Sequence, residues 1–190
     1  GDALAKEDII HEFTRELFPV ATVVTPNIPE AELLLGWEPG RIKTVGDAIE
    51  AAKALHEFGS EWVLVKGGHL SSSDAGGDCI DILYDGSQVH QLASKKILTE
   101  NTHGTGCTIG TAIACGLAGG LGVLASVASA KRYITQVIED SAGLQLGHDS
   151  VQGPMHHQAL KSWHNPILKS PSSYRLYAVT DSKINRRRGR

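Results

Sequence analysis

The chain has 190 residues, of which 41% are hydrophobic, 21% charged and 5% aromatic, with a formal net charge of −3. This is the composition of a globular protein, and its charge excludes a general electrostatic attraction to nucleic acid or to a membrane surface. No apolar run reaches the roughly 18 residues of a membrane-spanning helix. Three cysteines without a CxxC pair argue against a disulfide framework. We expect no targeting segment in this chain, and a start at Gly1 inside a longer protein.

The first predicted strands are short, apolar and rich in β-branched residues. They span residues 21–24 and 62–65, and such runs are typical of strands buried in a sheet. A helix is predicted at about residues 4–17, and Pro19 should end it. The apolar residues of that helix fall on one face, namely Ile9, Ile10, Phe13 and Leu17.

Two further helices are predicted between these strands, at residues 29–35 and 44–58. Gly36 and Gly59 stand just past their ends, and Thr44 is a suitable N-cap for the second helix. The inner face of that second helix should carry Ala48, Ala52 and Leu55. Helices placed between two buried strands favour an α/β fold in which the strands are parallel.

A loop and a hairpin are predicted after the second strand. Residues 70–78 are rich in Ser, Gly and Asp and should form the loop. Two strand-like segments, 80–84 and 88–93, flank the dipeptide Asp85-Gly86, which is a strong signal for a tight turn.

The remainder of the chain predicts two helices followed by a linker. A helix of small residues should run from Cys107 to about Leu117, and a long helix from residue 123 to about 146. Prolines and serines from residue 152 onward indicate a linker, after which residues 174–179 are again strand-like.

The segment 103–107, His-Gly-Thr-Gly-Cys, opens the small-residue helix and is the main candidate for a binding site. Gly104 and Gly106 allow successive backbone N–H groups to converge, and a helix start adds about half a positive charge. Such a site suits phosphate. It is not a Walker A loop, because no Lys-Ser/Thr pair follows, and the spacing to Gly110 misses GxGxxG by one residue. A plain tight turn before a packed helix is the alternative.

Cys107 lies at this helix start, where the helix dipole favours the thiolate. It could act as a base toward a hydroxyl or as a nucleophile. The alternative is a small buried cysteine, which is the usual environment of this residue. Cys79 and Cys115 are expected to serve packing only.

Polar residues follow both predicted strands at their carboxyl ends, where α/β sheets present ligand-binding groups. Lys66 follows the second strand and could neutralise phosphate, and Gly67 and Gly68 would allow close approach. Asn27 and Glu30 follow the first strand and could contact phosphate or Mg²⁺ through water. The alternatives are a solvated lysine and a pair of helix-capping residues.

Three motifs together carry a family resemblance. They are Thr25-Pro26-Asn27-x-x-Glu30-Ala31, Lys66-Gly67-Gly68-His69 and Asn101-Thr102-His103-Gly104-Thr105-Gly106-Cys107-Thr108. Their order and separation resemble the hydroxymethylpyrimidine/phosphomethylpyrimidine kinases of thiamine biosynthesis, within the ribokinase-like superfamily. Most of that superfamily has Gly-Ala-Gly-Asp where this chain has Gly104 to Cys107, and this kinase type has Cys. The resemblance covers residues 1–158 and implies the C-terminal portion of a three-layer α/β/α sandwich.

The resemblance also implies roles for individual residues, with ATP and Mg²⁺ as cofactors. The anion hole would consist of the N–H groups of Gly104, Thr105, Gly106 and Cys107. Cys107 and Lys66 would be catalytic, as the base and as the phosphate counter-charge. The nucleotide-binding residues would be Asn27, Glu30, Lys66, Gly68 and Thr102. Glu30 would also lie near Mg²⁺ as an indirect ligand.

The implied reaction is ATP-dependent phosphorylation of 4-amino-5-hydroxymethyl-2-methylpyrimidine and then of its monophosphate. The family's segment for the pyrimidine pocket does not precede Gly1, so we expect activity to be impaired in this chain. Pyridoxal kinase, a non-catalytic nucleotide-binding fragment and a thiol enzyme are the alternatives. ATP and a small pyrimidine would be the partners, without nucleic acid or membrane, and a homodimer would fit the family.

The end of the chain carries a second resemblance. Residues 174–181 resemble the first strand of thiamine-phosphate synthase, a (β/α)₈ barrel, so the chain resembles part of the plant-type bifunctional enzyme. The expected division is a kinase portion at 1–158, a linker at 159–172 and a truncated synthase start at 173–190. A plant origin would imply the plastid, and any other origin the cytoplasm.

Overall fold

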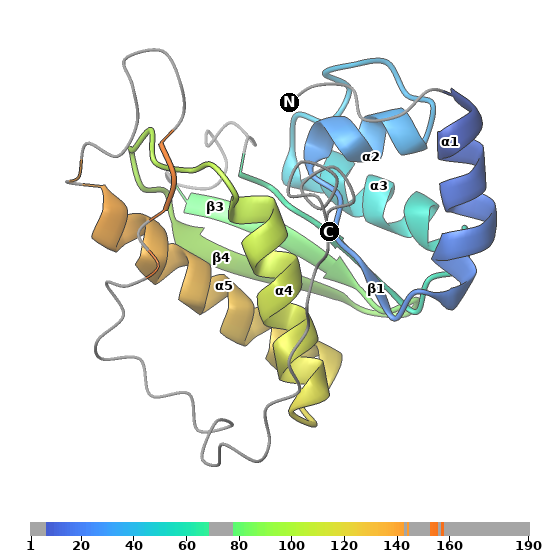
Figure 1. The fold of residues 1–190 in the computed structure, drawn as a ribbon. Coiled ribbons are helices and arrows are strands. Elements are labelled where there is room, and N and C mark those ends of the chain that lie inside the picture. Colours follow the sequence, from blue (N-terminus) through green and yellow to red (C-terminus); the bar gives the residue numbers. More distant parts are fainter. Residues whose placement is uncertain (1–6, 69–77, 143, 145–152, 156, 158–190) are drawn as a thin grey trace, which may run out of the picture.

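The computed structural model describes residues 7–68, 78–142, 144, 153–155 and 157 (Figure 1). It consists of a mixed sheet with helices on both faces. The expectations for a loop after Leu70, for a linker at 159–172 and for a further strand at 174–179 lie outside the described residues, apart from Asp78, which begins a strand.

The sheet has four strands in the order β1-β2-β3-β4 within the described part of the chain. They are β1 (Val23–Val24), β2 (Trp62–Val65), β3 (Asp78–Tyr84) and β4 (Val89–Lys95). The strands β1 and β2 are parallel, as predicted, and β3 is antiparallel to both β2 and β4. The predicted hairpin is confirmed, with Tyr84 opposite Val89, but residues 85–88 join its strands rather than Asp85-Gly86 alone. The strand β1 is shorter and less buried than expected, because it lies at the edge of the sheet and pairs through two residues only.

Alternate residues of the central strands enter two separate cores. Val63 and Val65 of β2 and Ile82 of β3 pack with Phe18 and with the helices α2 (Ile28–Leu34) and α3 (Val45–His56), whereas Leu64 and Leu83 pack with α4 (Thr105–Ala118) and α5 (Val123–Ser141). This alternation is the period-2 pattern of a sheet covered on both faces. Figure 1 shows the two groups of helices on opposite sides of the sheet. The predicted three-layer α/β/α arrangement is confirmed.

The first helix departs from its prediction. Helix α1 (Glu7–Glu12) continues through a π-helical turn, η1 (Phe13–Leu17), and a 3₁₀ turn, η2 (Phe18–Val20). The apolar residues predicted to share one face are not all buried, because Phe13 and Leu17 remain 47% and 50% exposed. The wide turn breaks the 3.6-residue period, and Phe18 is buried instead, edge-on against Phe58. Pro19 lies inside the 3₁₀ turn rather than ending the helix.

Helices α2 (Ile28–Leu34) and α3 (Val45–His56) begin with capping boxes and form the layer next to β2. Thr44 caps α3, as predicted. Helix α2 ends with Gly36 at φ 63°, where the N–H of Trp37 donates to the carbonyl of Glu32 in a Schellman arrangement. The predicted inner face of α3, comprising Ala48, Ala52 and Leu55, is fully buried.

Helices α4 (Thr105–Ala118) and α5 (Val123–Ser141) pack together on the other face. A Cβ on Gly116 would lie 2.7 Å from Oγ of Ser126, so the helices approach closely there. Helix α5 ends at Ser141, before the expected residue 146, and the amide of Asn101 donates to the carbonyls of Ser141 and Leu144 at this end. Cys115 is exposed, which contradicts the expected packing role.

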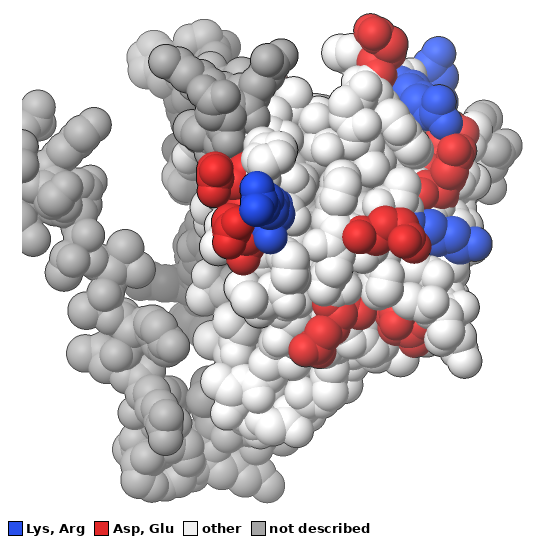
Figure 2. All heavy atoms as spheres, turned by 90° about the vertical axis from the view of Figure 1, so that its right-hand side faces the viewer, with Lys and Arg blue, Asp and Glu red and all other residues white. Residues whose placement is uncertain are grey.

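The surface over α1 to α3 carries charges of both signs. Figure 2 shows acidic and basic side chains interspersed on this face, with uncharged surface between them. Within the part of the chain that the structure describes, no helix is both long and apolar enough to cross a membrane.

Candidate functional site

Three elements converge near the end of β2. The backbone N–H of Lys66 donates to the carbonyl of Pro26 at 2.9 Å, and Asn27 forms a parallel bridge with Lys66. This pairing brings the start of α2 beside Lys66, the residue that follows β2. The Nζ atom of Lys66 lies 4.0 Å from Oε2 of Glu30. A Cβ built on Gly106 would be 3.5 Å from the same Nζ, so the ammonium also stands at the start of α4.

The start of α4 has no side-chain cap. Its N-cap is Gly104, at φ 88° and ψ 0°, a left-handed conformation that favours glycine. The N–H of Thr105 donates to the carbonyl of Thr102 at 3.3 Å. The N–H groups of Gly106 and Cys107 have no acceptor inside the helix, because the first turn of an α-helix lacks preceding carbonyls. They form an electropositive end suited to an anion.

Cys107 occupies the third position of α4 and its residue is exposed. The alternative of a small buried cysteine is therefore wrong for this residue. Cys79, in contrast, is partly buried in β3, and this burial raises the pKa of its thiol. A raised thiol pKa opposes reactivity and agrees with the packing role expected for Cys79.

Asn27 and Glu30 form the capping box of α2. The Asn27 side chain accepts the N–H of Glu30 at 2.8 Å, and the Glu30 carboxylate accepts the N–H of Asn27 at 2.8 Å. The capping alternative is thus confirmed for both residues. The same Oε2 atom faces Lys66, so capping also fixes a carboxylate beside the ammonium.

Gly68 and Thr102 lie in the loops that lead to and from the site. Gly68 is exposed, and a Cβ there would meet nothing within 4 Å. The carbonyl of Thr102 accepts both the N–H and the hydroxyl of Thr105. The backbone N–H of His103 donates a hydrogen bond to the carbonyl of Gly153, which positions the loop before α4.

Two buried residues that the sequence did not point to, Asp81 and Lys131, form an ion pair next to the turn after β2. Asp81 and Lys131 are 5% and 8% exposed, and their Oδ2 and Nζ atoms are 2.6 Å apart. The other carboxylate oxygen, Oδ1 of Asp81, accepts the N–H of Gly67 at 2.8 Å. The signal that could have found them is a lysine on the apolar face of α5, three residues before the buried Ile134.

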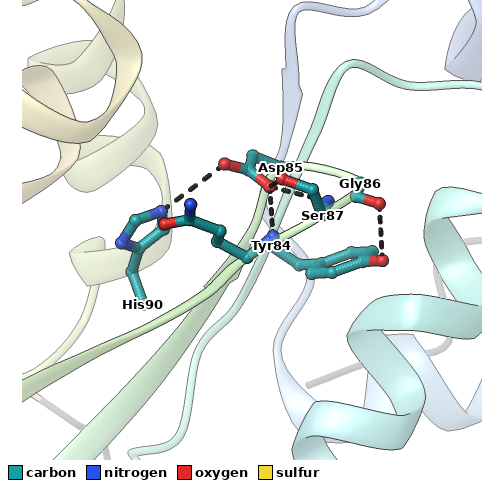
Figure 3. A network of polar contacts seen from close by, with 6 residues as sticks. Tyr84, Asp85, Gly86, Ser87 and His90 are labelled. Carbon is teal, nitrogen blue, oxygen red and sulfur yellow. Dashed lines mark hydrogen bonds and ion pairs between the residues drawn. The ribbon is translucent and has the colours of Figure 1, made fainter.

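A second polar cluster lies at the hairpin, where β3 ends (Figure 3). The Asp85 carboxylate accepts the N–H groups of Gln88 and Ser87, and these bonds lower its pKa to about 2. His90 lies 3.6 Å from the same carboxylate and stacks on Trp62. The side chain of Asp85 contacts Ser87, Gln88 and His90, which all lie within five residues of it, so this cluster stabilises the hairpin.

Comparison with known proteins agrees with this arrangement. Residues 1–156 match the family described as phosphomethylpyrimidine kinase. The chain is 40% identical, over 98% of its length, to the chloroplastic thiamine biosynthetic bifunctional enzyme TH1 of Arabidopsis thaliana, of which it covers 35%. It is 43% identical, over 83% of its length, to the hydroxymethylpyrimidine/phosphomethylpyrimidine kinase of Streptomyces coelicolor, of which it covers 54%. The chain thus spans about a third to a half of these relatives.

Solved structures are similar as well. An ADP complex of Bacillus subtilis pyridoxal kinase superposes with a TM-score of 0.72 at 38% identity, over 83% of this chain and 57% of that one. Pyridoxal kinase from Staphylococcus aureus in complex with AMP-PCP gives a TM-score of 0.74 at 31% identity, over 85% and 56% of the two chains. The match over residues 1–156, together with the α/β/α layers and the motifs around Lys66 and Gly106, shows that this chain belongs to the phosphomethylpyrimidine kinase family.

Proposed function

We propose that this chain supplies the nucleotide-phosphate part of a kinase. The reaction would transfer the γ-phosphoryl group of ATP to the hydroxyl of 4-amino-5-hydroxymethyl-2-methylpyrimidine, and a second one to its monophosphate. The observation that carries the proposal is the Lys66 ammonium standing beside Gly106 at the uncapped start of α4. A fixed cation and free N–H donors at one point are what a transferring phosphoryl group requires.

Each residue of the site has a place in this reaction. The N–H groups of Gly106 and Cys107 would bind oxygens of the γ-phosphoryl group, and Lys66 would offset the charge that moves toward the leaving ADP. The acceptor oxygen attacks the γ-phosphorus while the bond from that phosphorus to the bridging oxygen breaks. Cys107 would take the proton from the acceptor. Its exposure at the third position of α4 leaves its thiol accessible to an acceptor.

Mg²⁺ would fit this site only together with the nucleotide. No group of three His, Cys, Asp or Glu side chains that could hold a metal occurs among residues 7–68, 78–142, 144, 153–155 and 157. Mg²⁺ usually retains water and binds phosphate oxygens with one or two carboxylates. Glu30, about half exposed beside Lys66, is the carboxylate that would face it. The ion would supply charge neutralisation for the triphosphate.

Pyridoxal is the second candidate acceptor, because the similar ADP and AMP-PCP complexes are pyridoxal kinases. Thiamine-pyrimidine phosphorylation is favoured by the family match and by the names of the curated relatives. Assaying both acceptors with the same preparation separates these candidates. The chloroplastic relative supports a plastid location for a plant protein of this kind.

The first test is calorimetric titration with ATP, with and without Mg²⁺, on the chain and on Gly106→Asp. The new carboxylate would grow toward Nζ of Lys66 and occupy the phosphate position, so we expect at least a hundredfold loss of affinity. Gly110→Asp is the matched control. It places the same charge one turn further along α4, where a Cβ meets nothing within 4 Å, and should retain binding within about threefold.

Equal affinity of the parent chain and Gly106→Asp would place the nucleotide elsewhere and overturn the assignment. A folded parent chain that binds no ATP would also overturn it for this chain.

A further inference from the structure

The buried pair Asp81 and Lys131 lies beside the turn that follows β2. Lys131 comes from α5 and Asp81 from β3, and the two are 50 residues apart in the sequence. Both are more than nine-tenths buried, although each carries a charged group. Buried ion pairs contribute little net stability compared with apolar residues of the same size. Stability alone therefore gives no reason for this pair.

The pair has two further hydrogen-bond partners, the N–H of Gly67 and the carbonyl of Cys79. Oδ1 of Asp81 accepts the N–H of Gly67 at 2.8 Å in a buried hydrogen bond, while Oδ2 binds the ammonium of Lys131 at 2.6 Å. Lys131 also donates to the carbonyl of Cys79 at 3.4 Å, which fixes it against β3. Lys131 thus fixes one oxygen of the Asp81 carboxylate. The other oxygen accepts the N–H of Gly67, the residue that follows Lys66.

We infer that Asp81 is a positioning residue, oriented by Lys131, that fixes the turn after β2 so that the Lys66 ammonium stands at the start of α4. The ladder between β2 and β3 ends at the pair Val65 and Ile82, so it cannot fix Gly67. The N–H of Lys66 is already bonded to Pro26. Asp81 adds the next fixed point along the chain. The role in nucleotide binding rests on the proposed function, whereas the role in fixing Gly67 does not.

Two double variants separate positioning from packing. Asp81→Asn/Lys131→Met removes both charges but keeps a side-chain oxygen that can accept the Gly67 N–H. Asp81→Leu/Lys131→Met removes the charges and the acceptor together, and its leucine has the same number and branching of side-chain heavy atoms as asparagine. If the pair serves packing, the two variants should behave alike. If Asp81 positions the turn, the asparagine variant should rescue what the leucine variant loses.

The primary measurement is amide hydrogen exchange in protein labelled with ¹⁵N at glycine and valine. In the parent chain the Gly67 amide should exchange at least a hundredfold more slowly than an unprotected amide. It should stay protected in the asparagine variant and exchange at least tenfold faster in the leucine variant. The Val63 and Val65 amides, which lie in β2, serve as internal references and should not change.

The second measurement is ATP affinity of the same proteins. We expect the asparagine variant to bind within about threefold of the parent, and the leucine variant at least tenfold more weakly. A parent chain without ATP binding would refute the proposed function, and Gly67 exchange would still decide the positioning role. Fast exchange of Gly67 in the parent, or equal Gly67 protection in the two variants, would overturn the inference. If the leucine variant does not fold, fast exchange of Gly67 in the parent, or loss of Gly67 protection in the asparagine variant, still overturns the inference.

Discussion

The starts of α2 and α3 differ from the start of α4. Helices α2 and α3 each carry a capping box, in which Glu30 and Asp47 stand at the third helical position and accept a backbone N–H. At that same position α4 has Cys107, and its N-cap is a glycine without a side chain. Two helices thus satisfy their first turn with their own residues, while the third leaves its donors for another group. An uncapped start beside a lysine therefore indicates a ligand better than the glycines alone do.

The largest expected effect is on catalysis, at the third position of α4. Cys107→Ala should lower phosphoryl transfer in single-turnover assays by about 10²–10⁴-fold, the usual contribution of a general base. ATP affinity should change little, because the backbone N–H groups remain. Cys115→Ala is the matched control, since Cys115 is also an exposed cysteine of α4. Similar transfer rates in the two variants would exclude the thiol as the base.

The next effect concerns the conformation that opens α4. Gly104→Ala should lower the free energy of unfolding by about 1–2 kcal/mol, because an L-residue is strained at φ 88°. It should also weaken ATP binding, because the backbone at residue 104 would relax to a negative φ. This change would turn the first N–H groups of α4 away from a bound phosphate. Gly122→Ala is the control at the N-cap of α5, where φ is −66° and the space around a Cβ is equally open. Chemical denaturation that gives the two variants the same stability would contradict this account.

At the capped helices, loss of the capping side chain should lower stability, and only one of the two caps should affect ATP binding. Thr44→Ala and Asn27→Ala should each lower the free energy of unfolding by about 1 kcal/mol, the typical value of an N-cap. Only Asn27→Ala should also alter ATP affinity, because it loosens the carboxylate of Glu30 beside Lys66. Urea denaturation and calorimetry measure the two effects. An altered ATP affinity in Thr44→Ala would show that these helix starts are not independent.

The smallest effect is a pH dependence at the start of α3. Hydrogen bonds from the N–H groups of Lys43 and Thr44 lower the pKa of Asp47 below its ordinary value of 3.8. A lowered folded-state pKa contributes stability above the unfolded pKa, and that stability is lost as the pH falls through the folded value. Asp47→Asn should therefore flatten the dependence of the urea midpoint on pH below about pH 4. An unchanged slope would mean that the cap persists when Asp47 is protonated.

Local signals in the sequence predicted much of this fold. Thr44 capped its helix, Asp85-Gly86 formed the turn of a hairpin, and the apolar period of α3 identified its buried face. Each of these signals depends on residues within about four positions of one another.

Features that depend on distant contacts could not be found in this way. The exposure of Phe13 follows from a π-helical turn that no periodicity indicates. The end of α5 contacts Asn101, which lies 40 residues before Ser141. The sequence motifs identified Lys66 and Gly106 as candidate site residues. Only the fold showed that the Lys66 ammonium lies beside Gly106. Asp81 and Lys131 escaped notice because a charge inside an apolar pattern gives no indication of its partner.

The loop before α4 is held from two sides. The side chain of Asn101 binds carbonyls at the end of α5, and the backbone of residues 100 and 103 binds Gly153. The chain thereby closes a ring of about fifty residues, with the glycine turn at the point of closure. Local opening of this turn would have to release the end of α5 and the segment at Gly153 as well. The turn, both helices and that segment should therefore unfold as one cooperative unit, which protects the start of α4 from independent fraying.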